Sequence, residues 1–448
     1  MAIAHNIAVL GASLGGLIAA AELRSHGCQV TIIEKGHSVG GLYSEASTPF
    51  GSQEIGMHVI YANNRQYKHL CDIFGAASFH TMTGSCVDKG ASANFGEIYF
   101  GSHYPCLLEH PLRNKVLEEI LAITEEIKDY NPSNAEEEST RRFGVTAGRS
   151  VVGPILEKLW KTEPKHLTKD ALHCFFDLRR LVIAHKNEAD ILKECPSLDN
   201  IIANPDQDFP KGQVYGGRMG LLFRKGCKGL SHSVNEWARR SEIKISYGSD
   251  VKVLGGNIIV NSELIRDQFD ACIVAVPIHL LADAFTADPH KADKSELSIY
   301  YYQLEQPLGK SFSTYYILAH DPNFSSSRVV NYDSYRPYDE RSHRSVISVE
   351  AIHKPRAAPS INKIHKEISQ LLPSSKIIDS YQLPKPLSIY TPTIDNRDFL
   401  NGFETSIRSS FAKPIFFTGM RTDTGIFFSH HTIGLAYESA LECIEQLS

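Results

Sequence analysis

The stretch Asn6-Ile-Ala-Val-Leu-Gly-Ala-Ser-Leu-Gly-Gly16 reads as a short buried strand, a glycine-rich turn and the start of a helix. An alanine-rich helix is predicted from Leu14 to His26, and a second strand from Gln29 to Glu34. Together these elements form a compact β-α-β unit. The turn follows the pattern G-x-G-x-x-G with serine at the second glycine, which predicts a dinucleotide pyrophosphate at the helix N-terminus.

Each position of this turn has a physical role. Gly11 permits the tight turn, Ser13 stands where the backbone approaches the pyrophosphate, and Gly16 allows close packing of helix and strand. Glu34 ends the second strand, where its carboxylate can accept hydrogen bonds from both ribose hydroxyls. The same carboxylate would repel a 2′-phosphate, so NADP is disfavoured here. The competing interpretation is that a glycine-rich turn before a helix serves only packing.

Composition sets the class of protein. The chain has 448 residues, 42% hydrophobic and 22% charged, and is too long for one compact core, which predicts two interleaved domains. The net charge is -5 and the basic residues are scattered, so neither a nucleic acid nor a membrane surface is expected as a partner. No apolar run is long enough for a membrane span. The nine cysteines form no C-x-x-C pair, which argues against disulfides and a zinc cage and favours a reducing cytoplasm.

Beyond the first unit, hydrophobic periodicity predicts further elements. The charged stretch 134–142 predicts a crossover between domains, and the alternating residues 296–352 predict the sheet of a substrate domain. Helices are expected at 112–130, 150–161, 168–184, 229–240 and 432–446, and strands at 243–247 and 269–276.

A second glycine turn follows Glu34 closely, in Val39-Gly40-Gly41-Leu42-Tyr43. The combination resembles a large group of FAD enzymes that contains amine oxidases, protoporphyrinogen oxidase, carotenoid-type desaturases and UDP-galactopyranose mutase. In that group an acid, a short spacer and a Gly-Gly turn lie against the flavin phosphates. The resemblance therefore implies FAD, rather than NAD, as the cofactor.

Five further stretches resemble segments of the same group. Within them, Glu54-Ile-Gly-Met-His58 resembles the segment that passes the isoalloxazine ring, and Val251 resembles the valine that meets the adenine. The departures are Ser13, Glu54 where Asp is usual, and Arg421-Thr-Asp where Gly-Asp or Gly-Arg is commoner. The five stretches are Glu54–Ile60, Phe143–Leu167, Lys225–Val251, Phe269–Pro277, and Ile415–Arg421 with Gly434 and Ala436 beyond it.

The resemblance implies an α/β fold in which a Rossmann-type FAD-binding domain, like that of glutathione reductase, is interleaved with an α+β substrate domain. That second domain would contain a mixed or antiparallel sheet and a helical part. The implied order is FAD-binding at 1–105, a helical substrate part at 106–210, FAD-binding at 211–290, the substrate-domain sheet at 291–395 and FAD-binding at 396–448. The residues expected to hold FAD are Gly11, Ser13, Leu14, Gly15, Gly16, Glu34, Lys35, Gly40, Gly41, Leu42, Tyr43, Met57, His58, Val251, Gly419, Arg421, His431 and Thr432.

Four residues are candidates for the chemistry: His58, Arg218, Tyr332 and Arg336. A neutral imidazole beside the flavin could move a proton, whereas the structural alternative is a histidine satisfied by backbone groups. Arginines could clamp an anionic group with tyrosines stacking beside them, although a single arginine is more often exposed. No set of side chains has the spacing of a metal site.

Three functions are compatible with these residues. The first is an FAD-dependent oxidoreductase in which a small polar, anionic substrate transfers hydride to flavin N5. A nucleotide sugar or an amine is the small-molecule partner expected. The second is a non-redox isomerase similar to UDP-galactopyranose mutase, which uses reduced FAD. The third is an FAD-binding partner without turnover. No second G-x-G-x-x-G is evident for NAD(P)H, and the sequence leaves the substrate, the electron acceptor and the oligomeric state open.

Overall fold

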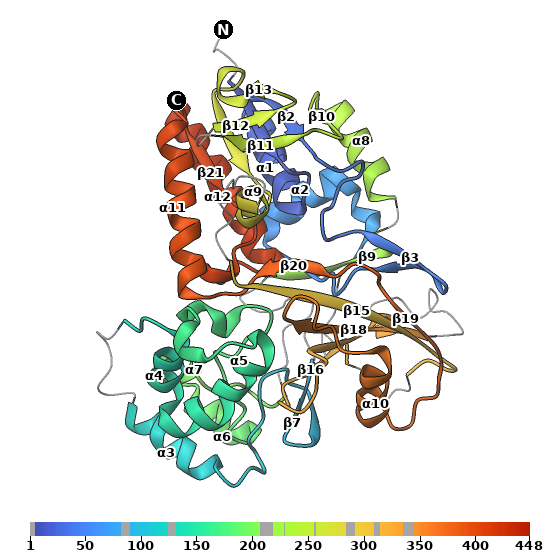
Figure 1. Ribbon diagram of the computed structural model, residues 1–448, viewed down its shortest axis with the longest axis vertical. Helices are drawn as coiled ribbons and strands as arrows, with labels where there is room; N and C mark the ends of the chain where they lie inside the picture. Colours follow the sequence, from blue (N-terminus) through green and yellow to red (C-terminus); the bar gives the residue numbers. More distant parts are fainter. Residues whose placement is uncertain are drawn as a thin grey trace.

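Three parts of the chain are visible in the computed structural model: a Rossmann-type part at the top of the view, a helical part at lower left and a large sheet at lower right (Figure 1). Within the part of the chain that the structure describes, no helix combines the length and the apolar composition needed to cross a bilayer. The described residues are 5–81, 90–123, 131–206, 218–227, 229–254, 257–283, 292–308, 314–334 and 345–448.

A five-stranded parallel sheet forms the centre of the Rossmann-type part. Ala8 of the central strand pairs with Thr31 on one side and Cys272 on the other, so segments more than 260 residues apart lie side by side. Both faces of this strand are covered, which explains its continuous apolar sequence. The strand order is β10 (Lys244–Ser246), β2 (Gln29–Ile33), β1 (Asn6–Leu10), β14 (Ala271–Val274) and β21 (Ile415–Phe417).

Different layers cover the two faces of this sheet. One core contains side chains from four helices: α1 (Leu14–Ser25), α2 (Asn64–Phe74), α8 (Leu230–Arg240) and α12 (Ser429–Leu447). The core on the other face contains side chains from an antiparallel sheet and two helices: β11 (Val251–Leu254), β12 (Asn257–Val260), β13 (Glu263–Leu264), α9 (Ile278–Asp283) and α11 (Ile394–Ser410). This layering confirms the predicted Rossmann-type fold class.

The second large sheet has eight strands and is mixed, because β16 and β7 run parallel while the other pairs are antiparallel. Helix α10 (Ile361–Leu371) packs on one face. The strands β7 and β8 fall within 1–105 yet belong to this sheet, so the chain leaves the Rossmann-type part before residue 91. The strands are β7 (Ala91–Asn94), β8 (Glu97–Phe100), β15 (Lys294–Leu304), β16 (Tyr316–Ala319), β17 (Arg328–Asn331), β18 (Ser345–His353), β19 (Ile377–Gln382) and β20 (Leu387–Tyr390).

The helical part packs against the other face of that sheet. Two sequence predictions were wrong here. The charged stretch 134–142 is not a crossover, because Asn134 caps the N-terminus of helix α4 (Ala135–Ala147) and the rest of the stretch lies within that helix. Residues 168–184 were predicted to be a helix, but they contain only a short 3-10 helix at Lys169–His173. The segment 168–184 mostly forms loops that cross the core and bury apolar side chains. The spacing of these apolar residues resembles that of a helix, which explains the wrong prediction. The helices are α3 (Arg113–Ile123), α4 (Ala135–Ala147), a π-helix (Gly148–Val152), α5 (Gly153–Trp160), α6 (Lys186–Leu192) and α7 (Pro196–Asp199).

Two small antiparallel sheets connect these parts. The hairpin of β3 and β4 precedes the segment that contains His58, and β9 pairs with β5 and β6 on the other side of it. These short strands place Glu54, His58 and the end of β9 next to one another. Their bounds are β3 (Glu45–Thr48), β4 (Gly51–Glu54), β5 (Ile60–Ala62), β6 (Phe79–Thr81) and β9 (Met219–Cys227).

Candidate functional site

The glycine turn after β1 has the geometry that the sequence predicts. Gly11 has a φ of +98°, and a Cβ atom on Gly16 would lie 2.1 Å from the Gly11 carbonyl oxygen, so neither position accepts a side chain without a shift. Ser13 has a φ of -69° and needs no glycine. Its hydroxyl turns inward, accepts a hydrogen bond from the Gly16 amide at 3.3 Å and donates to the Ala275 carbonyl. Ser13 is therefore the N-cap of α1, and because its side chain points inward, backbone groups form the outer side of the turn.

The second glycine turn docks on the first. The Gly40 amide donates to the Ala12 carbonyl at 2.8 Å, and Gly40 and Ser13 form a parallel bridge. Gly40 has a φ of +105°, and a Cβ atom there would lie 2.5 Å from the Tyr43 carbonyl oxygen. Gly41 also has a positive φ, of +60°. The two turns thus form one cradle of backbone groups at the N-terminus of α1, which is a favourable place for phosphates.

Glu34 lies at the carboxyl end of β2 beside this cradle. Its carboxylate accepts hydrogen bonds from the Ala12 amide at 2.8 Å and from the Gly36 amide at 2.6 Å. These bonds hold the acid at the position that the sequence predicts for a ribose contact. Val251 starts β11 nearby and packs against the core behind β2.

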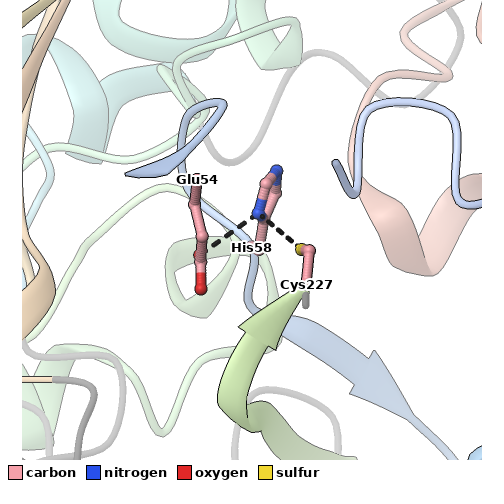
Figure 2. A group of neighbouring side chains, drawn as sticks. All are labelled: Glu54, His58 and Cys227. Carbon is pink, nitrogen blue, oxygen red and sulfur yellow. Dashed lines mark hydrogen bonds and ion pairs between the residues drawn. The ribbon is translucent and has the colours of Figure 1, made fainter. Parts of the chain in front are cut away.

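The predicted flavin-facing segment is buried between the three parts of the molecule. Figure 2 shows His58 with its Nδ1 atom 3.2 Å from a Glu54 carboxylate oxygen and 3.4 Å from the sulfur of Cys227. The imidazole stacks on the ring of Tyr43, with 4.7 Å between centroids. Its other nitrogen, Nε2, is buried and finds no hydrogen-bond partner among the residues that the structure describes, so a bound group could serve as one.

Tyr332, a predicted catalytic residue, supports this segment from the large sheet. Its hydroxyl lies 3.1 Å from the Glu54 carbonyl oxygen and 3.0 Å from that of Gly56. Tyr301 donates to the same Glu54 carbonyl at 2.9 Å. Both tyrosines are buried. The structure therefore places Tyr332 against the backbone that carries His58, where it positions the segment.

A buried ion pair lies directly behind the same segment. Arg328 of β17 donates to the Glu350 carboxylate of β18 at 2.6 Å, and the Glu350 side chain is fully buried. The other oxygen of Glu350 comes within 3.0 Å of a Cβ atom built on Gly56. The guanidinium also lies over the ring of Phe175 from the helical part, 4.7 Å from its centroid. This pair joins the sheet to both other parts.

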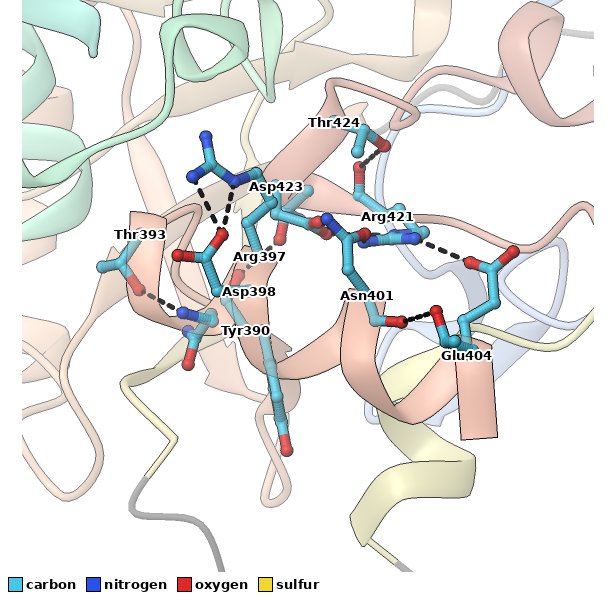
Figure 3. A network of polar contacts seen from close by, with 12 residues as sticks. Tyr390, Thr393, Arg397, Asp398, Asn401, Glu404, Arg421, Asp423 and Thr424 are labelled. Atoms are coloured by element: carbon cyan, nitrogen blue, oxygen red, sulfur yellow. Dashed lines mark hydrogen bonds and ion pairs between the residues drawn. The ribbon is translucent and has the colours of Figure 1, made fainter. Parts of the chain in front are cut away.

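The chain returns to the cradle through β21 and α12. A Cβ atom on Gly419 would lie 2.0 Å from the Val276 carbonyl oxygen, so this glycine is required for close packing. Figure 3 shows Arg421 among acidic and amide side chains of α11 and the following turn. Its guanidinium bonds to Asp423 at 2.5 Å, to Glu404 at 2.9 Å and to Asn401 at 2.9 Å. Arg421 thus orders the backbone after β21.

Three histidines gather at the N-terminus of α12. The rings of His430 and His431 lie 4.1 Å apart, and His173 of the helical part is 5.9 Å from His431. The Nδ1 atoms of His430 and His431 are buried, and no described group is their hydrogen-bond partner. Burial is the main cause that lowers the pKa of all three histidines, to about 4 for His173, about 3 for His430 and about 4 for His431. The charge of Arg179 contributes to each of these shifts, and His431 contributes to that of His430.

Three charged side chains act on this histidine group. The charges of Arg218 and Arg179 lower the pKa of His430 and His431, whereas that of Asp177 raises it. Arg179 binds Asp177 through two hydrogen bonds of 2.8 Å. Burial opposes ionisation of Asp177, but this arginine nevertheless lowers the pKa of the carboxyl to about 2. The Arg179–Asp177 ion pair and Arg218 therefore both influence the N-terminus of α12.

We expect the histidine group to destabilise the fold in acid. Their pKa values are lower in the folded chain than the ordinary 6.5, so the unfolded chain binds more protons between pH 6.5 and about 4. The free energy of unfolding should fall as the pH drops through this range, by up to about 1.4 kcal/mol per pH unit for each group. Urea titrations of the wild type and of His431→Gln should show a shallower fall in the variant. His232→Gln, on an exposed residue, should leave the slope unchanged.

Lys158 of α5 is buried and ties the helical part to the large sheet. Its ammonium group donates to the carbonyl oxygens of Ala319 and of Ser326, the second at 2.8 Å. Burial lowers the pKa of Lys158 to about 7. Lys158 therefore holds the two parts together, and its side chain is committed to backbone acceptors.

We expect this lysine to give a stability change of the same sign, in a higher pH range. Between pH 7 and 10 the unfolded chain keeps the lysine proton that the folded chain loses, so this group stabilises the fold increasingly as the pH rises. Over that range the free energy of unfolding of the wild type should rise relative to that of Lys158→Met, by up to about 1.4 kcal/mol per pH unit. A difference that does not change with pH would contradict this assignment.

The remaining predicted residues are placed as follows. Leu14 and Gly15 are buried at the start of α1, and Gly15 packs against Thr432 of α12. Met57 packs against the core of the helical part, whereas Lys35 and Leu42 are exposed. Arg336, with the neighbouring Tyr338 and Arg341, and the stretch 215–217 lie outside the described residues.

Sequence reasoning missed Arg179, Asp177 and Cys227. Asp177 and Arg179 had a local signal, since an acid and a base two residues apart interrupt the apolar stretch 174–183. Cys227 had none, because only the pairing of β9 with β5 brings it to His58. Tertiary structure alone identifies such contacts.

Comparisons with known proteins agree with this geometry. Residues 9–77 match the family model of the NAD(P)-binding Rossmann-like domain. No curated protein sequence matches the chain. Among solved structures, reduced UDP-galactopyranose mutase is similar, with a TM-score of 0.68, 15% identity, and coverage of 99% of this chain and 96% of that one.

Two further structures have the same architecture. A candidate protoporphyrinogen oxidase from Exiguobacterium sp. 255-15 has a TM-score of 0.61 and 12% identity, with coverage of 99% of each chain. Putrescine oxidase bound to putrescine has a TM-score of 0.55 and 13% identity, again with 99% of each chain covered. At these identities the likeness is one of fold. Residues 9–77 therefore belong to a dinucleotide-binding domain of the Rossmann type, and the chain as a whole shares the fold of these three structures.

Proposed function

We propose that this protein is an FAD-dependent oxidoreductase that removes a hydride from a small polar, anionic substrate. The observation that carries the proposal is the cradle formed where the Gly40 turn docks on the Gly11–Gly16 turn, with Glu34 held beside it. A nicotinamide site needs only the first of these turns, whereas the second turn leads into Tyr43, whose ring stacks on His58.

The described residues fit FAD. Positive φ angles at Gly11, Gly40 and Gly41 leave backbone without Cβ atoms where phosphates would lie. The buried Nε2 of His58 lacks a partner, as do the Nδ1 atoms of His430 and His431, and a bound flavin and its substrate would provide such partners. FAD would supply the two-electron acceptor for the hydride.

The protein's own residues would bind and orient the substrate. Arg218 would supply positive charge near the N-terminus of α12, where no described side chain caps the helix, whereas the charge of Arg179 is balanced by Asp177. This arrangement favours an anionic group. The neutral His430 and His431 can donate or accept a hydrogen bond at pH 7, so they suit a polar substrate without adding charge.

Some residues that suit an isomerase, within the stretch Phe143–Leu167 and at Tyr390, instead serve packing. Lys158 bonds to backbone carbonyls, and Trp160 is fully buried in the helical core. Tyr390 is also buried, donates to Asp283 at 2.9 Å and stacks on His279. With these side chains committed elsewhere, we favour the oxidoreductase.

The test is an anaerobic absorbance titration of the purified protein with candidate amines, alcohols and nucleotide sugars, followed by air. Bleaching of the flavin by one of these substrates, reversed by an acceptor with formation of oxidised product, is the expected result. Bleaching only by an external reductant, with turnover of a nucleotide sugar and no net electron transfer, would establish the isomerase instead. Failure to bind FAD after attempted reconstitution would contradict the proposal as a whole.

We expect Arg218→Met to weaken substrate binding and to leave the chemistry largely intact. Loss of a charged contact to an anion should raise KM by about tenfold or more, with a small change in kcat. The matched control is Arg224→Met in β9, because Arg224 is exposed and bonds to the carbonyl of Phe79. Equal KM values for Arg218→Met and the wild type would exclude Arg218 from the substrate site.

A further inference from the structure

Three side chains with metal-binding atoms meet at the end of β9. Glu54 and His58 come from the segment after β4, and Cys227 ends β9, 169 residues further along the chain (Figure 2). One carboxylate oxygen, Nδ1 and the sulfur lie within 4.8 Å of one another. Zinc sites with nitrogen, sulfur and oxygen ligands have bonds of about 2.0–2.3 Å. An ion placed among these three atoms would need only small side-chain movements to reach such distances.

Hydrogen bonding alone does not satisfy this cluster. Nδ1 of His58 carries either one hydrogen or one lone pair, so it can serve Glu54 or Cys227 but not both. If Nδ1 donates to the carboxylate, the thiol has no acceptor there. If Nδ1 accepts from the thiol, the carboxylate has no donor from His58. A metal ion bonds to all three atoms at once, because each of them offers a lone pair.

The charge around the cluster also favours a cation. Glu45 and Glu54 both approach Gly226, where a Cβ atom would lie 3.3 Å from one carboxylate and 2.8 Å from the other. No lysine or arginine side chain that the structure describes pairs with either acid. A cation bound among these atoms would therefore face two carboxylates.

A second acid lies beside the cluster. Glu45 belongs to the hairpin of β3 and β4, where it accepts a hydrogen bond from the exposed Ser52. The absence of C-x-x-C pairs predicted no metal site, but that pattern detects only ligands that are close in sequence.

We propose that Glu54, His58 and Cys227 form a zinc site with three protein ligands and one open position. The ion binds Nδ1, the Glu54 carboxylate and the Cys227 sulfur, and the thiol releases its proton to solvent. Three protein ligands with a free fourth position are the arrangement of a reactive, rather than a purely structural, zinc site. Binding at Nδ1 leaves the hydrogen of His58 on Nε2, so the imidazole presents a donor to the interior.

The experiment uses the full chain stripped of metal and without FAD, so its outcome does not depend on the proposed oxidoreductase activity. Co²⁺ is the probe, because a bond between cobalt and a thiolate gives an intense near-ultraviolet absorption. Titration of the wild type should produce this absorption with one equivalent of Co²⁺, and Zn²⁺ should remove it. No thiolate band in the folded wild type would overturn the proposal.

Variants identify the ligands. Cys227→Ser should abolish the band, and Glu54→Gln, which keeps a hydrogen-bond acceptor for His58, should raise the Kd for Co²⁺ by about tenfold or more. The matched control is Cys195→Ser, since Cys195 is exposed and distant in sequence. A band lost in the Cys195 variant and kept in the Cys227 variant would assign the metal to the surface and disprove the site. If Cys227→Ser does not fold, Glu54→Gln alone decides, and an unchanged Kd in it contradicts the proposal.

Discussion

Gly40→Ala should abolish tight binding of FAD while the rest of the chain still folds. The φ of +105° at this position is costly for any residue with a side chain, by about 1–3 kcal/mol, and the new methyl group would lie 2.5 Å from the Tyr43 carbonyl oxygen. The turn must therefore move away from Ala12 and Ser13, which removes half of the cradle. We expect the Kd for FAD to rise at least about a hundredfold, or about 3 kcal/mol, measured by fluorescence titration of the apoprotein.

Gly51→Ala is the matched control for this experiment. Gly51 has a similar φ of +96°, but a Cβ atom there meets nothing within 4 Å. Its substitution should cost backbone strain alone and leave the affinity for FAD unchanged. A Gly40 variant that binds FAD as tightly as the Gly51 variant would show that the second turn takes no part in the cofactor site.

Glu350→Gln should produce the largest loss of stability among single polar substitutions at the site. The change leaves the buried guanidinium of Arg328 without its counter-charge, and breaking a buried pair in this way costs about 3–5 kcal/mol. Because Glu350 also lies behind Gly56, we expect the segment that carries His58 to loosen. Urea denaturation followed by circular dichroism measures the first effect, and hydrogen exchange at residues 54–58 measures the second.

Two further variants separate charge from packing. Glu305→Gln breaks an exposed pair with Lys376 and should change the free energy of unfolding by less than about 1 kcal/mol. The double variant Arg328→Met with Glu350→Leu removes both charges and should recover part of the loss. If the double variant is as unstable as Glu350→Gln, the isolated charge is not the cause.

The cofactor cradle could be predicted from the sequence because its determinants are local. Gly11, Gly16 and Glu34 lie within one β-α-β unit, where spacing along the chain translates directly into position. The alternation of residues 296–304 likewise identified a strand of the large sheet, which is β15. Local pattern was therefore sufficient for the first part of the fold.

Contacts that depend on tertiary structure could not be predicted in this way. Tyr332 was a candidate for the chemistry, and Lys158 lies in a stretch that resembles flavoenzymes. In the structure Lys158 donates to backbone carbonyls of the large sheet, and Tyr332 bonds to the backbone of the Glu54 segment. Residues 168–184 carry apolar side chains at nearly helical spacing, yet they mostly form loops because these loops cross a core formed by several elements. The partners in each case lie more than a hundred residues away or in another layer.

The central strand β1 has consequences for how this chain folds during its synthesis. Its neighbour β14 begins at Ala271, and β21, which completes the sheet, begins at Ile415. During synthesis β1 therefore emerges from the ribosome long before β14 and β21 have been made. During that time the apolar strand has only β2 and α1 to cover it, and an uncovered strand edge is prone to aggregation. We therefore expect the edge of β1 to need protection, for example by a nascent-chain chaperone, until β14 has been synthesised.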